Sequence, residues 1–90
     1  MKIPSRIKIG AIYWRVLEVE PSEIDCDSQA SGDSDNKTCT IRINKHLPTA
    51  QKELTLLHEV LHSINEQLDH VQVEFLALCL HQIFSENEVF

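Results

Sequence analysis

The sequence predicts an α+β fold in which a three-stranded, mostly antiparallel sheet packs against a helix, with a second, buried helix beside it. Apolar and polar residues alternate before residue 45, whereas apolar residues recur at three- and four-residue spacing after residue 49. Strands followed by helices are the order of an α+β domain. A chain of 90 residues is long enough for one such domain with a single core. We therefore expect one domain over residues 1–90, with the sheet in 1–45 and the helices in 49–85.

The strands are predicted from alternation and from turn residues. Residues 6–20 alternate around Gly10, which indicates two strands, or one bent strand with a turn at the glycine. Residues 38–44, TCTIRIN, alternate again and are rich in β-branched side chains, so they are expected to form the third strand. Residues 21–37 consist mainly of Ser, Asp, Asn and Gly and are expected to form an acidic surface loop. We expect Trp14 to pack the sheet against the helix.

The two helices are predicted from apolar spacing. A helix that begins near Thr49 and ends between residues 67 and 70 has one apolar face, made by Leu54, Leu57, Leu61 and Ile64. Its N-terminal signal is weak, because no full capping box follows Thr49. Residues 71–84 predict a second helix that is apolar over most of its circumference. We therefore expect this second helix to be largely buried.

Composition excludes several classes of protein. The net charge of −6 argues against nucleic-acid binding, which needs clustered Lys and Arg. No stretch is long and apolar enough to span a bilayer, and the N-terminus lacks the apolar block of a signal peptide, so we expect no membrane association and a cytoplasmic location. Cys26, Cys39 and Cys79 form no paired spacing, which favours reduced thiols over a disulfide framework.

The segment HEVLH, from His58 to His62, carries the chemistry of the chain. Histidines four residues apart on a helix stand on one face, within reach of a single cation. Glu59, beside the first histidine, can then act as a general base towards a water on the metal. We therefore expect one Zn²⁺ bound by His58 and His62.

Glu74 is the expected third zinc ligand. It interrupts an apolar helix that is predicted to be buried, and a buried carboxylate requires a partner. Two histidines, one glutamate and a water form a known catalytic zinc arrangement. There are two alternatives: Glu74 reaches solvent at the start of its helix, or His70 or Asp69 replaces it as the third ligand.

The order of these motifs resembles a known group of enzymes. HEVLH followed by a glutamate on the next helix resembles the gluzincin metallopeptidases. The order of segments from IPSRIKIG to LTLLHEVLH resembles small metallopeptidases carried by phages and prophages of Gram-positive bacteria. This resemblance covers nearly the whole chain and is strongest from Thr40 to Phe84.

The resemblance implies a minimal zincin-like fold and a role for each site residue. His58, His62 and Glu74 would be the zinc ligands and Glu59 the general base. The strand over residues 38–44 would be the sheet edge beside the cleft, where a peptide or protein substrate adds as a further strand.

Three functions are compatible with these features. The first is a zinc-dependent metalloendopeptidase, expected to be slow or narrowly selective because the sequence singles out no oxyanion donor. The candidates for that donor are Tyr13, His46, His70 and His81. Each also has a structural explanation: Tyr13 would pack on a strand, His46 and His70 would be exposed in loops, and His81 would lie on a helix surface. The second is a non-catalytic zinc-binding regulatory or protein-interaction module of phage or prophage origin. The third is a zinc-free interaction protein in which HEVLH is incidental. An open coordination position distinguishes a catalytic zinc site from a structural one.

Overall fold

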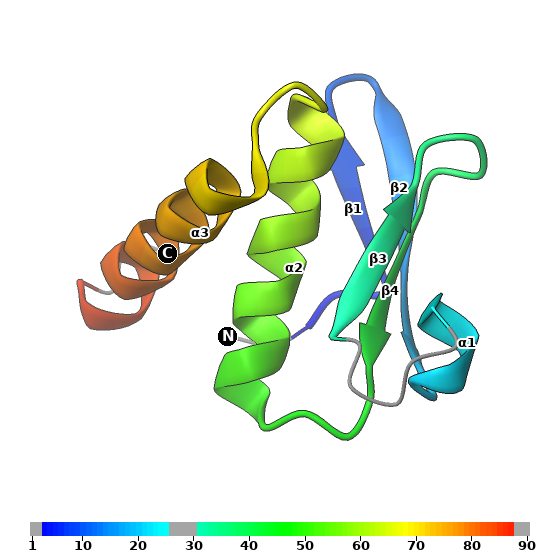
Figure 1. Cartoon of the computed structure of the whole chain (residues 1–90), viewed down its shortest axis with the longest axis horizontal. Coiled ribbons are helices and arrows are strands. Elements are labelled where there is room, and N and C mark those ends of the chain that lie inside the picture. Colours follow the sequence, from blue (N-terminus) through cyan, green and yellow to red (C-terminus); the bar gives the residue numbers. More distant parts are fainter. Residues whose placement is uncertain (1–2, 26–30, 88–90) are drawn as a thin grey trace.

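A computed structural model describes residues 3–25 and 31–87, and Figure 1 shows one sheet with two long helices on one side of it. The elements in chain order are β1 (Arg6–Ile9), β2 (Ile12–Val19), α1 (Ser22–Asp25), β3 (Gly32–Asp35), β4 (Thr40–Asn44), α2 (Thr49–Ile64) and α3 (His70–Glu86). The predicted α+β class and the order of strands before long helices are confirmed.

The sheet itself differs from the predicted three-stranded, mostly antiparallel sheet. It has four strands in the order β1-β2-β4-β3. β1 with β2 and β3 with β4 are antiparallel, but the central strands β2 and β4 run parallel. The long connection after β2 makes this possible, because it carries the chain back before β4 begins.

The additional strand, β3, lies in the segment predicted to be an acidic loop over residues 21–37. That segment also contains the short helix α1, whose Ile24 is buried; residues 26–30, with Cys26, lie outside the described part. The sequence of β3, GDSD, has low strand propensity, so its tertiary contacts hold it in the sheet. Asp33 accepts a hydrogen bond of 2.8 Å from Nε of Arg42 on β4. Such contacts are not visible in local sequence patterns.

Two glycines have specific positions in the sheet. Gly10 adopts a φ of +63° in the turn between β1 and β2, which decides in favour of two separate strands. At Gly32, a Cβ would lie 2.6 Å from Cγ2 of Thr55 and 2.7 Å from the carbonyl oxygen of Arg42. The absence of a side chain at Gly32 therefore lets β3 approach α2 closely.

The core lies between the sheet and α2. Its buried side chains are Trp14, Val16, Ile41, Ile43 and Leu56. Trp14 therefore packs as predicted. The face that α2 turns inward is not the predicted one: its buried residues are Glu53, Thr55, Leu56 and Glu59. Leu54, Leu57 and Leu61 are half-buried and Ile64 is 64% exposed, so the predicted apolar face is wrong in detail. The helix ends at Ile64, earlier than the predicted end between residues 67 and 70.

The prediction that the second helix is largely buried is wrong. Among the described residues of α3, only Val73 and Ala77 are buried. Val71, Phe75 and Leu78 are 77%, 67% and 54% exposed. Figure 1 shows why: α3 lies beside α2, on the side away from the sheet. In the part of the chain that the structure describes, no helix is both long and apolar enough to cross a membrane.

Candidate metal centre

The centre of the site is the pair His58 and His62 on α2. Their Nε2 atoms are 3.1 Å apart, and both residues are partly buried. Two nitrogens at the usual Zn–N distance of roughly 2.0–2.1 Å in a tetrahedral site are about 3.3 Å apart. The observed spacing therefore fits two ligands of one ion with little movement.

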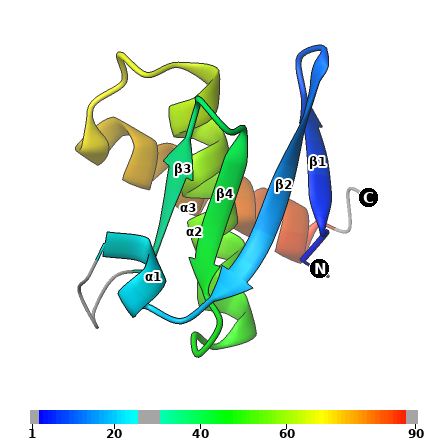
Figure 2. The same cartoon turned by 90° about the vertical axis from the view of Figure 1, so that its right-hand side faces the viewer.

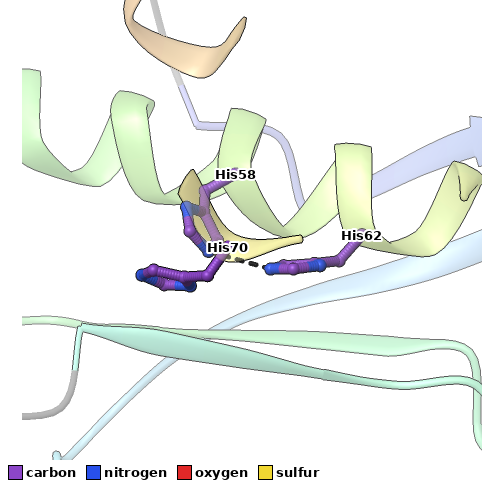
Figure 3. Close-up of side chains that lie close together, drawn as sticks. All are labelled: His58, His62 and His70. Atoms are coloured by element: carbon purple, nitrogen blue, oxygen red, sulfur yellow. Dashed lines mark hydrogen bonds between the residues drawn. The ribbon is translucent and has the colours of Figure 1, made fainter. Parts of the chain in front are cut away.

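His70 joins this pair from the first position of α3. Ring nitrogens of the three histidines lie within 4.8 Å of one another. The ring centroid of His70 is 4.8 Å from that of His58 and 6.2 Å from that of His62. Figure 3 shows the three rings close together beside α2. The structure thus brings His70, one of the two alternatives for the third ligand, into the site.

A capping box fixes the position of His70. The side chain of Asp69 accepts a hydrogen bond of 2.8 Å from the backbone N–H of Gln72. In return, the backbone N–H of Asp69 donates to the Gln72 side chain at 3.1 Å. Asp69 therefore serves as the N-cap, and among the described residues the histidine cluster consists of His58, His62 and His70 without it. This D-x-x-Q pattern is the signal that could have placed His70 on a helix rather than in a loop.

Glu74 lies next to the histidine cluster but not inside it. One of its carboxylate oxygens, Oε1, is 3.9 Å from Nδ1 of His58 and 3.7 Å from Nε2 of His70. Its side chain is 59% exposed, so the expected burial of this carboxylate is wrong. His70 and Glu74 are separated by four residues on α3, as His58 and His62 are on α2. Two such pairs, one on each helix, meet at the site.

The predicted general base, Glu59, is 6% exposed and lines the groove beside His58. Burial raises the pKa of Glu59 to about 7, and the negative charge of Asp33 adds to the rise. A hydrogen bond with the Ser34 side chain acts in the opposite direction and lowers this pKa. A carboxyl group that titrates near neutral pH both accepts and returns a proton readily, as general acid–base catalysis requires.

The environment of His58 suits metal binding. Burial lowers the pKa of His58, and the neighbouring His62 and His70 lower it further, whereas Glu74 opposes this. A neutral imidazole is the form that coordinates a metal. The donor set and its spacing therefore fit a zinc ion.

A groove of about 730 Å³ runs past His58, Glu59, His70 and Glu74, between β3 on one side and α3 on the other, with α2 as its floor. Its lining residues are Ser31, Gly32, Asp33, Gln51, Leu54, Thr55, His58, Glu59, His70, Glu74, Ala77 and Leu78. The sheet edge at this groove is β3, not the strand over residues 38–44. That strand, β4, pairs with β2 on one side and β3 on the other, so a substrate strand cannot add to it.

The other residues considered as oxyanion donors lie away from the groove. Nε2 of His46 is 2.7 Å from Glu20, and Nε2 of His81 is 2.8 Å from Glu53. Tyr13 is on β2, under the guanidinium of Arg6. Among the residues named from the sequence for this role, His70 is the one that lines the groove.

The chain has no match in three comparisons: with models of known protein families, with curated proteins and with solved structures.

Proposed function

We propose that this chain is a zinc-dependent metallopeptidase-like protein that hydrolyses peptide bonds with Glu59 as the general base. The observation that carries this proposal is the position of Glu59: its buried carboxyl lines the same groove as His58 and His70. A purely structural metal site has no need for a carboxyl group that titrates near pH 7 beside it.

The ligands of the ion would be His58, His62 and either Glu74 or His70. Zinc bound there would supply Lewis acidity and make a water molecule acidic enough to attack at neutral pH. Glu59 would accept the proton from that water and pass it to the leaving amine. If Glu74 is the third ligand, His70 remains free to donate a hydrogen bond to the developing oxyanion.

The substrate would be an extended peptide paired with β3. This strand is at the edge of the sheet and lines the groove beside His58 and Glu59. An added strand gains backbone hydrogen bonds whatever its sequence, so side-chain selectivity would depend on the groove walls. β3 has only four residues, so it can hold only a short part of a substrate in place. Because weak positioning of the substrate slows the reaction, we expect slow, selective cleavage.

A second candidate function is a non-catalytic zinc-binding module. The observation in its favour is that His70 and Glu74 both lie beside the histidine pair. If both bind the ion, four protein ligands close the site, as in structural zinc sites.

The deciding experiment compares the zinc-loaded wild type with Glu59→Gln on a peptide library, with metal content measured for both. We expect cleavage by the wild type that a chelator stops, and none by Glu59→Gln although its zinc content is unchanged. Equal behaviour of both proteins on every substrate, including the chain itself, would favour the second candidate.

A further inference from the structure

The face of the sheet opposite the helices carries a cationic patch. It consists of Arg6 and Lys8 on β1 and Tyr13 and Arg15 on β2, which we call the β1–β2 patch. All four residues are exposed. In Figure 2, α2 and α3 lie behind the sheet, so this face of β1 and β2 is turned towards the viewer. The patch is therefore on the other side of the sheet from the metal centre.

The register of the two strands places like charges together. Arg6 is directly opposite Arg15, and Lys8 is directly opposite Tyr13. Facing residues of an antiparallel pair have their Cβ atoms about 4.5–5.5 Å apart, and like charges in this position are destabilising. The guanidinium of Arg6 lies 4.6 Å from the Tyr13 ring centroid, and the Lys8 ammonium lies 5.5 Å from it. Two cations, Arg6 and Lys8, thus lie against one aromatic ring, whereas Arg15 on the same face donates a hydrogen bond of 3.4 Å to the Thr40 hydroxyl.

Carboxylate partners distinguish other basic residues of the chain from these three cations. Arg42, Lys45 and Lys52 form ion pairs with carboxylates. Within residues 3–25 and 31–87, no ion pair to a carboxylate involves any of the three cations of the β1–β2 patch. This is unusual in a chain that has 14 acidic residues against 8 Lys and Arg.

Protection of a sheet edge explains only part of this arrangement. Charged side chains, Lys above all, commonly prevent edge strands from pairing with other chains, and β1 is an edge strand. That accounts for Lys8. It does not account for Arg15, because β2 is an inner strand with β1 and β4 on its two sides.

From this geometry we propose that the β1–β2 patch binds an acidic segment of a partner protein in an extended conformation. A strand added to the free edge of β1 would place every second side chain on the face that carries Arg6 and Lys8. Acidic residues at those positions would neutralise the cations that the chain leaves unpaired. The acidic partner segment would thus supply negative charge beside Arg6 and Arg15, two cations that face each other in the sheet.

A nucleic acid fits this surface less well. Sheets that bind single strands typically stack several bases on aromatic side chains, whereas the β1–β2 patch has one tyrosine, already in contact with Arg6.

The test is fluorescence anisotropy with the full chain and a labelled peptide in which Glu alternates with Thr. The comparison ligands are a peptide in which Lys alternates with Thr and an oligothymidylate. The patch variant is Arg6→Gln with Arg15→Gln. The matched control, Lys37→Gln with Lys45→Gln, removes the same charge elsewhere on the surface. All measurements are made at low salt, with and without a chelator.

We expect the Glu-Thr peptide to bind with or without chelator, and affinity to fall about tenfold in the patch variant and less than about twofold in the control. The patch variant should melt close to the wild type, because relief of the like-charge pair offsets the loss of the Arg6–Tyr13 contact and of the Arg15 hydrogen bond to Thr40. Three results would overturn the proposal: no binding of the Glu-Thr peptide, equal loss in both variants, or tighter binding of the oligothymidylate.

Discussion

The Nε2 atom of His81 lies 2.8 Å from Oε1 of Glu53, and this contact joins the second half of α3 to the first turns of α2. Both side chains are largely buried, with 19% and 8% of their surface exposed. Because α3 lies beside α2 and away from the sheet, a polar contact between the two helices helps to fix how α3 is placed. The position of α3 in turn sets where His70 and Glu74 meet the histidines of α2.

The first prediction concerns the pH dependence of this pair. The hydrogen bond with His81 lowers the pKa of Glu53 below its ordinary value of 4.5, although burial opposes this. A carboxyl whose pKa is lower in the folded state contributes stability above its unfolded pKa, and this contribution is lost as the pH falls through the folded value. Wild-type stability should therefore decrease as the pH falls below about 4.5. The same decrease should be smaller in His81→Ala.

At pH 7, His81→Ala should lower the free energy of unfolding by about 1–3 kcal/mol, because a buried carboxylate loses a donor. His81→Gln retains an N–H donor and should lose less. Urea titrations of the three proteins at pH 7 and in the acid range measure both effects. Parallel stability curves for the wild type and His81→Ala at all pH values would contradict the role given to this contact.

The second prediction tests which side of α3 is packed. Val73 is fully buried, whereas Phe75 is 67% exposed. Val73→Ala should cost about 1–3 kcal/mol of unfolding free energy through lost contacts and a residual cavity. Phe75→Ala should change it by less than about 0.5 kcal/mol, as is usual for surface sites. If Phe75→Ala is the more damaging substitution in urea titrations, α3 is rotated relative to the arrangement described above.

The third prediction concerns the close approach at Gly32. In Gly32→Ala the new Cβ would meet both Thr55 and the backbone of Arg42, so β3 must shift away from α2. Forcing an extra carbon into such a packed position typically costs roughly 1–3 kcal/mol. Adding Thr55→Ser removes one of the two clashes and should restore part of the loss, which a double-mutant cycle measures. Full additivity of the two substitutions would show that Thr55 is not the obstacle.

Much of the fold could be predicted from the sequence because its signals are local. Alternation located β1, β2 and β4, and apolar spacing located α2 and α3 within a few residues of their ends. By contrast, β3 forms from GDSD, a sequence of low strand propensity, and its contacts are with Arg42 on the next strand and Thr55 on α2. The parallel pairing joins β2 to β4, two strands that are separated in the chain by α1 and β3. Local patterns carry no record of such contacts.

The candidate site could also be predicted only where its residues are close in sequence. HEVLH specified His58, Glu59 and His62 because helical spacing alone puts the two histidines on one face. The partner residues on α3 depend on how that helix packs, and the prediction that its apolar sequence is largely buried is wrong. Glu74 is therefore more exposed, and His70 closer to the centre, than the sequence predicts.

The last prediction concerns the zinc ligands. His58→Ala and His62→Ala should each abolish stoichiometric zinc binding, because each removes a ligand from a site with few others. Glu59→Gln should bind zinc as the wild type does, since a general base need not touch the ion. Elemental analysis after dialysis measures this. Full zinc content in either histidine variant would remove the basis for the metal centre.

The third ligand is decided by comparing Glu74→Ala with His70→Ala. If Glu74 is the ligand and His70 an oxyanion donor, Glu74→Ala should weaken zinc affinity and abolish the gain in melting temperature on adding zinc. His70→Ala should then retain zinc and lose turnover by roughly a hundredfold to a thousandfold. The reverse pattern of affinities would make His70 the ligand, in agreement with the cluster in which ring nitrogens of all three histidines lie within 4.8 Å of one another. Loss of affinity in both variants, with no cleavage by the wild type, would identify a closed four-ligand site and hence the binding module rather than the enzyme.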